Sequence, residues 1–151
     1  MFQSITRVVF GVISVALLIG AFVGSEGFED SDSENAMLPP CRHGVVLQME
    51  LFNSIVDHPD YMADSSRWGI ELARALNSPS FKLLYDIYHM QIMEGNLVAN
   101  IKENHEWYGH YHVAGVPGRN EPWEAQEINY PAVMTAIEST GFNGYVALEY
   151  L

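Results

Sequence analysis

The chain has 151 residues, a length that predicts one domain with a core of its own. It carries 19 acidic and 7 basic residues, a net charge of -12, and no cluster of lysine or arginine. This balance argues against nucleic acid and anionic membrane surfaces as partners, because binding to phosphates requires many cationic side chains. Cys41 is the single cysteine, so no disulfide can form within the chain.

The first 24 residues form a segment of their own. Arg7 is the only charged residue before Glu26, and residues 8–24 contain no strongly polar residue apart from Ser14. A short basic start followed by a long apolar run is typical of a secretory signal peptide or an amino-terminal membrane anchor. The sequence leaves both open. We therefore expect an exported or membrane-anchored protein, or a cytoplasmic one if the start codon is misassigned.

Residues 25–42 link this segment to the rest of the chain. They are acidic and rich in serine, and Pro39 and Pro40 stand near their end. A segment of this composition cannot bury enough apolar surface to fold, so it predicts a disordered, solvated linker. The predicted folded domain is therefore residues 43–151.

The folded domain alternates between strand and helix patterns. Short apolar runs predict strands over 43–52, 81–87, 108–114 and 144–151. Apolar residues at three- and four-residue steps predict helices over 64–76, 96–106 and 131–140. Capping oxygens begin the first helix at Asp64 and Ser65, and Pro131 suits the first turn of the last. Strands and helices in alternation predict parallel βα units.

Each predicted strand carries a potential metal ligand near its carboxyl end. The four residues are Glu50, Asp86, His112 and Glu149. In a parallel sheet these ends lie on one side, which is where α/β enzymes build their active sites. Three carboxylates and one imidazole suit Mg²⁺ or Mn²⁺ better than structural zinc, which favours Cys and His. The pattern predicts a site for a divalent metal ion.

The same side chains have structural interpretations that the sequence leaves open. Asp86 could cap a helix that follows its strand, and Glu50 and Glu149 could form caps or salt bridges. His110 and His112 are two residues apart, so a strand places both on one face, and His110 could be a packed interior residue. The recurrence at all four strand ends favours a metal site over capping alone.

Four stretches of the domain resemble one known family. They are LLYDIYHMQIMEG (83–95), GHYHVAGVPGRNEP (109–122), EINYP (127–131) and GFNGYVALEY (141–150). They resemble the hydroxypyruvate isomerase branch of the xylose isomerase-like TIM barrels, which also holds ketose 3-epimerases. The resemblance implies an α/β fold in which this chain supplies the C-terminal half, about strands 5 to 8, of a (β/α)8 barrel. A complete barrel of this kind has typically ~250 residues.

The resemblance also implies roles for individual residues. The four strand-end residues would hold a divalent ion, Mg²⁺ or Mn²⁺, and Glu50 and Glu149 would in addition transfer a proton. His89 and Arg119 would hold the oxygens of the substrate. The implied reaction is an aldose–ketose isomerisation through an ene-diolate, as from hydroxypyruvate to tartronate semialdehyde. No redox cofactor is implied.

Alternatives to this function stay open. His112 stands where hydroxypyruvate isomerases often have glutamine, which favours a ketose 3-epimerase. The chain could also be an inactive barrel fragment, or a binding module, that has kept the ligands. A DNA-acting relative of endonuclease IV would need a basic groove, which the net charge of -12 opposes. The expected partners are a small hydroxy-carbonyl or sugar substrate and, to close the barrel, a second copy of the chain or a complementing half-barrel.

Overall fold

The computed structural model describes residues 45–123 and 125–151. The expected signal peptide or anchor (1–24) and the expected linker (25–42) both lie outside these residues. Within the described part of the chain, no helix combines the length and the apolar composition needed to cross a bilayer.

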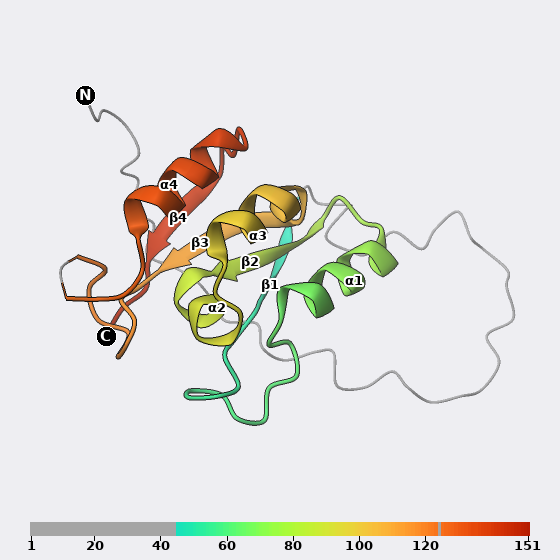
Figure 1. Cartoon of the computed structure of the whole chain (residues 1–151). Helices are drawn as coiled ribbons and strands as arrows, with labels where there is room; N and C mark the ends of the chain where they lie inside the picture. The colour runs from blue at the N-terminus through green and yellow to red at the C-terminus, as the bar shows by residue number, and fades with distance from the viewer. Residues whose placement is uncertain (1–44, 124) are drawn as a thin grey trace, which may run out of the picture.

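Four strands form one parallel sheet in the order β1-β2-β3-β4 (Figure 1). Their bounds are β1 Leu47–Glu50, β2 Phe81–Asp86, β3 Tyr108–Val113 and β4 Tyr145–Leu148. The prediction of four parallel strands in βα units is confirmed. Each strand is shorter than predicted, because apolar residues continue beyond the last backbone pairing.

The helices are α1 Ser66–Leu76, α2 Ile87–Met93, α3 Leu97–Asn104 and α4 Tyr130–Ser139, with a 3-10 turn η2 at His105–Trp107. The Ser65 side chain caps α1 by accepting from the backbone N–H of Trp68. Pro131 lies in the first turn of α4, as predicted. The interpretation of Asp86 as the cap of a helix after its strand is confirmed by α2, although its 7 residues are too few to show a helical period.

The core lies between the sheet and the helices, which cover one face of the sheet (Figure 1). Leu83 and Tyr85 of β2 and Tyr111 of β3 are fully buried in it. Side chains alternate along a strand, so Asp86 and His112 point to the opposite face. That face corresponds to the inside of a barrel.

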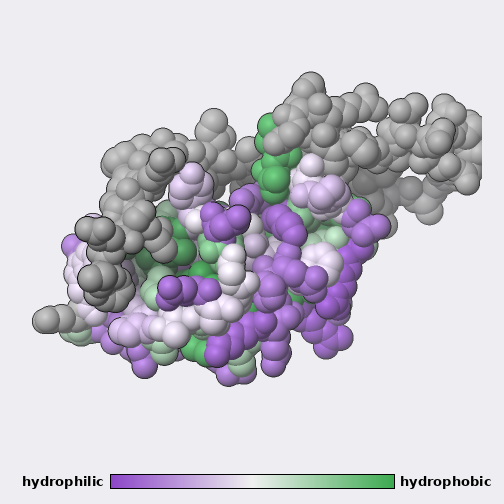
Figure 2. Space-filling model, turned by 90° about the horizontal axis from the view of Figure 1, so that it is seen from above, coloured by the Kyte–Doolittle hydropathy of each residue, from purple (hydrophilic) through white to green (hydrophobic). Residues whose placement is uncertain are grey.

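The two outer strands are more exposed than the two inner strands. Among the described residues, each outer strand has a neighbour on one side only. Leu47 of β1 is 43% exposed, and Tyr145 and Leu148 of β4 are 48% and 53% exposed. Seen from above, hydrophilic side chains cover most of the described surface, with apolar areas between them (Figure 2). The outer strands are thus suited to pairing with further strands.

Candidate active site

The four residues predicted as metal ligands converge at the carboxyl ends of the strands. One ligand atom from each of Glu50, Asp86, His112 and Glu149 lies within 4.8 Å of the other three. The strand register explains the convergence, because Asp86 pairs with His112 and Glu149 directly follows β4. We refer to these four residues as the carboxylate cluster.

Asp86 uses its two oxygens in different ways. Oδ1 accepts hydrogen bonds from the backbone N–H groups of Tyr88 (2.8 Å) and His89 (3.3 Å), which caps α2. Oδ2 faces the cluster and accepts from Arg119 at 3.1 Å. Burial raises the pKa of Asp86 to about 7, while Arg119 opposes this rise and Glu50 adds to it. Capping and a place in the cluster are therefore compatible for this residue.

His112 lies among the negative charges of the cluster. Its Nδ1 is 2.9 Å from Glu149 Oε2 and 3.4 Å from Glu50 Oε1. These distances allow ion pairs, but the atoms are poorly aligned for hydrogen bonds, and Nδ1 has no hydrogen-bond partner among the described residues. Burial lowers the pKa of His112, but the two carboxylates outweigh it and raise the pKa to about 9. The cluster therefore holds a proton on this ring.

The donor set of the cluster fits a divalent cation. Two of its buried atoms, Glu50 Oε1 and His112 Nδ1, lack a hydrogen-bond partner in the described part of the chain. Buried polar atoms of this kind commonly mark the place of an ordered water or an ion. Three carboxylates and one imidazole offer mostly hard oxygen donors. A cation would supply the positive charge that the His112 proton and Arg119 supply here.

Arg119 reaches the cluster from the loop after β3. Its φ angle is 55°, in a region that is unfavourable for a residue with a side chain. Its Nη2 donates to Asp86 and to Glu149, and its guanidinium lies 4.8 Å from the centre of the Tyr88 ring. Contact with His112, assisted by Arg119, lowers the pKa of Glu149 to about 2. The predicted substrate-binding arginine is thus in direct contact with two of the four predicted ligands.

His89 of α2 is fully buried beside Arg119. Its Nε2 lies 2.7 Å from Arg119 Nη1 and 3.7 Å from Asp86 Oδ2. Burial and the adjacent guanidinium lower the pKa of His89 to about 3, so the ring is neutral. Phe52 packs against it edge to face, with ring centres 5.1 Å apart. Both residues predicted to bind substrate therefore border the cluster.

A polar network that supports His89 was not predicted from the sequence. Asn53, fully buried after β1, lies 2.7 Å from His89 Nδ1 and donates to Asp57 at 2.7 Å. The Tyr88 hydroxyl donates to the same Asp57 oxygen at 2.8 Å. The available signal was its position in MELFN just beyond a strand end, but its partner His89 is 36 residues away.

His110 does not belong to the carboxylate cluster. Its ring stands edge to face with that of His112, with centres 5.0 Å apart. Burial and the neighbouring His112 lower the pKa of His110 to about 4. This half-buried position agrees with its interpretation as a packed residue on the inner face of the sheet.

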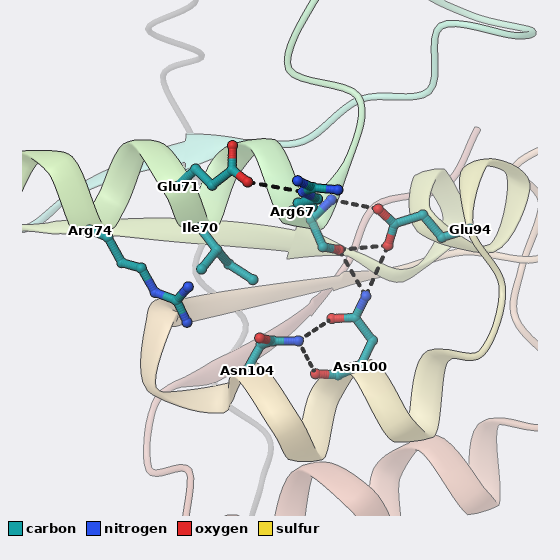
Figure 3. Close-up of a pocket in the computed structure, with 8 residues that line it drawn as sticks. Arg67, Ile70, Glu71, Arg74, Glu94, Asn100 and Asn104 are labelled. Atoms are coloured by element: carbon teal, nitrogen blue, oxygen red, sulfur yellow. Dashed lines mark hydrogen bonds and ion pairs between the residues drawn. The ribbon is translucent and has the colours of Figure 1, made fainter.

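A hollow lies among the helices, between α1 and α3 (Figure 3). Glu94 borders it and accepts from the backbone N–H and the hydroxyl of Ser66 at 2.6 and 2.7 Å. It also accepts from Asn100 at 2.9 Å. Donors of the chain itself therefore bind both oxygens of this carboxylate, which ties the start of α1 to α3. This arrangement is structural and separate from the cluster.

Residues 41–151 match the family model described as xylose isomerase-like TIM barrel. A putative hydroxypyruvate isomerase from Homo sapiens is 35% identical over 128 residues, or 80% of this chain and 46% of that protein. The hydroxypyruvate isomerase of Escherichia coli K12 is 34% identical over 109 residues, 72% of this chain and 42% of that protein. A 2-oxo-tetronate isomerase from Pectobacterium atrosepticum is 33% identical over 72% of this chain and 40% of its own length. The chain spans less than half the length of these relatives.

Solved structures show the same partial overlap. The AP endonuclease, family 2, from Brucella melitensis has a TM-score of 0.69 at 33% identity, over 73% of this chain and 42% of that structure. A D-psicose 3-epimerase in the presence of D-fructose has a TM-score of 0.64 over 74% and 37%, and at 20% identity it shows the fold alone. With a family model matched over residues 41–151 and four parallel strands in barrel order, this chain belongs to the xylose isomerase-like TIM barrel family and forms part of such a barrel.

Proposed function

We propose that this chain carries the catalytic residues of a metal-dependent isomerase that acts on a small hydroxy-carbonyl compound. The observation that carries the proposal is the convergence of four potential ligands within 4.8 Å at the ends of four parallel strands. His89 and Arg119, which can both bind substrate oxygens, border this cluster. The isomerase names of the relatives support the reaction class.

The proposed reaction removes a proton from a carbon atom next to a carbonyl group. A divalent ion held by the cluster would act as a Lewis acid that stabilises the negative charge developing on oxygen. Glu149, with its pKa lowered to about 2, is ionised at neutral pH and can accept the proton. Glu50, whose carboxylate belongs to the same cluster, would take the proton of the substrate hydroxyl and deliver it to the neighbouring carbon. Glu149 would give its proton to the former carbonyl oxygen, so both glutamates would end ionised as they began.

Hydroxypyruvate is the proposed substrate, and tartronate semialdehyde the product. The guanidinium of Arg119 can form paired hydrogen bonds with a carboxylate, which hydroxypyruvate has. If Arg119 turned from Glu149 to the substrate, Glu149 would lose a stabilising positive charge and become a stronger base. Substrate binding and activation of the base would then be coupled.

Epimerisation of a sugar is the second candidate. The solved 3-keto-D-glucoside 4-epimerase of Escherichia coli favours it, with 28% identity and a TM-score of 0.59 over 74% of this chain and 40% of that structure. An epimerase removes a proton from one face of a carbon and returns one to the other face. Glu50 at the end of β1 and Glu149 after β4 approach the cluster from the two outer strands, which suits such a transfer.

The exposed outer strands lead us to a proposal about assembly. Leu47 is an exposed apolar residue at one edge of the sheet, and Tyr145 and Leu148 are exposed at the other edge. We propose that both edges pair with further strands, from a second copy or from a complementing half-barrel. The part of the relatives that this chain matches is less than half of their length, so full activity would depend on further strands at both edges.

The test uses the full chain with Mn²⁺, assayed for conversion of hydroxypyruvate and for epimerisation of ketoses in each assembly state. Glu149→Gln removes one proposed ligand and base, while Glu138→Gln changes an exposed glutamate on α4 and serves as the matched control. We expect wild type and the control to bind about one ion per chain and to convert substrate, and Glu149→Gln to lose conversion. Metal binding without conversion in any assembly state would support a binding module instead. No metal binding by the wild type would refute the site.

A further inference from the structure

The hydrogen bonds around Asn53 determine which way its side-chain amide points. Oδ1 accepts from the backbone N–H groups of Val56 at 3.0 Å and Asp57 at 2.9 Å. Nδ2 donates to Asp57 Oδ2 at 2.7 Å. Turning the amide over would place Nδ2 against two N–H donors and Oδ1 against a carboxylate oxygen, so three hydrogen bonds would be lost. The amide nitrogen therefore faces His89.

This orientation constrains the ring of His89. Asn53 Nδ2 lies 2.7 Å from His89 Nδ1 and can only donate, so Nδ1 must be the acceptor and carry no proton. An imidazolium carries a proton on both nitrogens, so a ring whose Nδ1 accepts from Asn53 is neutral. A neutral imidazole has one proton, which must then be on Nε2.

The Nε2–H group points into the candidate active site. Arg119 Nη1, which is also a donor, lies 2.7 Å away, so two N–H groups face each other there. Of the two donors that contact the His89 ring, Arg119 has other acceptors in Asp86 and Glu149 and is partly exposed. The Asn53 amide is fully buried, so Arg119 is the donor that can move away from the ring. A substrate oxygen that moved Nη1 away from Nε2 could accept from both groups.

We propose that Asn53 is a positioning residue that sets the tautomer of His89, so that this ring presents an Nε2–H donor to a substrate oxygen. The substrate part of this inference rests on the proposed function. Asp57 and Tyr88 belong to the same hydrogen-bond network, because the Asp57 carboxylate accepts from both Asn53 and the Tyr88 hydroxyl. Tyr88 in turn lies under the guanidinium of Arg119. One network thus positions both groups that face the substrate.

A charge-neutral exchange of two residues tests the tautomer directly. In the double variant Asn53→Asp/Asp57→Asn, the carboxylate at 53 can only accept, so His89 must donate to it from Nδ1, and Nε2 loses its proton. The amide at 57 can donate to position 53 and to the Tyr88 oxygen, so the number of hydrogen bonds is kept. Asp57→Asn alone is the matched control, because the backbone N–H groups of Val56 and Asp57 still fix the Asn53 amide.

The readout is the ¹⁵N spectrum of the histidine rings in the full-length protein, with His89→Gln identifying the signal of His89. We expect an Nε2–H tautomer in wild type and in Asp57→Asn, and an Nδ1–H tautomer in the double variant. An Nδ1–H tautomer in wild type would overturn the inference even if the double variant failed to fold. An unchanged tautomer in a folded double variant would overturn it as well.

Kinetics separate this inference from the proposed function. If the protein is an isomerase, the inverted tautomer should lower kcat by ~100-fold or more, the usual effect of losing one donor to a developing negative charge, with a smaller change in KM. Equal turnover by wild type and the double variant would refute the substrate role of His89. If wild type shows the Nε2–H tautomer but converts no substrate, the proposed function and the substrate role fail, while the control of the tautomer by Asn53 stands.

Discussion

The inner and outer strands of the sheet present the four cluster residues in different ways. Asp86 and His112, at the ends of β2 and β3, are 0% and 1% exposed. The side chains of Glu50 and Glu149, at the outer strands, are 11% and 43% exposed. Within the part of the chain that the structure describes, the inner pair has strands on both sides and the outer pair has a strand on one side. In the described chain, Asp86 and His112 are thus held inside the sheet, whereas Glu50 and Glu149 lie at its two edges.

Burial also separates the acids of the cluster electrostatically. It raises the pKa of Asp86 to about 7, whereas contact with His112 and Arg119 lowers the pKa of Glu149 to about 2. A buried carboxylate of this kind needs a cation, and a half-exposed one can meet a substrate. The inner pair is therefore suited to metal binding alone, and the outer pair to proton transfer. Four predictions test this division, and the largest effect comes first.

Asp86→Asn should have the largest effect on metal binding. The amide oxygen can still cap α2, but the negative charge is lost, and we expect the affinity for Mn²⁺ to fall by ~100-fold or more. Without metal, stability at neutral pH should stay the same or rise by ~1 kcal/mol, because the raised pKa of Asp86 means that burial opposes its charge more than Arg119 and His112 favour it. Asp86→Ala, which also removes the cap, should instead lose ~1 kcal/mol. Calorimetric titration and urea unfolding measure both effects, and equal destabilisation by the two variants would contradict the proposed roles of the two oxygens.

The affinity for metal should rise with pH. His112 is protonated below its pKa of about 9, and a metal ion must displace that proton, so affinity should increase about tenfold per pH unit between about pH 7 and pH 9. Below about pH 7 the protonation of Asp86 should steepen the dependence. His112→Gln should remove the slope above pH 7. A flat profile in the wild type would mean that His112 does not compete with the metal.

Glu149→Gln should have a smaller effect than Asp86→Asn. The Glu149 side chain is 43% exposed, so water screens its ion pairs, and we expect stability to change by no more than ~0.5 kcal/mol. The affinity for Mn²⁺ should fall only ~10-fold, because water can take the place of an exposed ligand. Titration of both variants under one set of conditions gives the comparison. A loss as large as that of Asp86→Asn would remove the distinction between inner and outer strands.

Leu148→Lys should have the smallest effect on the chain itself. Leu148 is 53% exposed at the free edge of β4, so a lysine there should change stability by less than ~0.5 kcal/mol while opposing pairing with another strand. Sedimentation should then show less association than in the wild type. Ile55→Lys, at a 66% exposed residue in the loop after β1, is the control and should leave association unchanged. Equal association of wild type and both variants would argue against pairing at β4.

Local patterns were enough to predict the strands, three helices and the four cluster residues. Each of these depends on nearby residues: an apolar run, a cap such as Ser65, or an acid at a strand end such as Asp86. The helix α2 was left as one of two interpretations of Asp86, because it is specified by one capping carboxylate and not by a period. The contact between Asn53 and His89 joins residues 36 apart and depends on how strands and helices pack together. A single sequence carries no local signal for such a contact.

The backbone of Arg119 implies a conflict between stability and activity at one position. Its φ of 55° costs a non-glycine residue about 1 kcal/mol or more, and glycine would be free of that cost. Selection for thermal stability alone would therefore favour glycine at 119, which would also remove the guanidinium beside Asp86 and Glu149. A variant of this protein selected for stability should therefore also be assayed for turnover. The substitution that relieves the backbone at 119 also removes the guanidinium from the cluster.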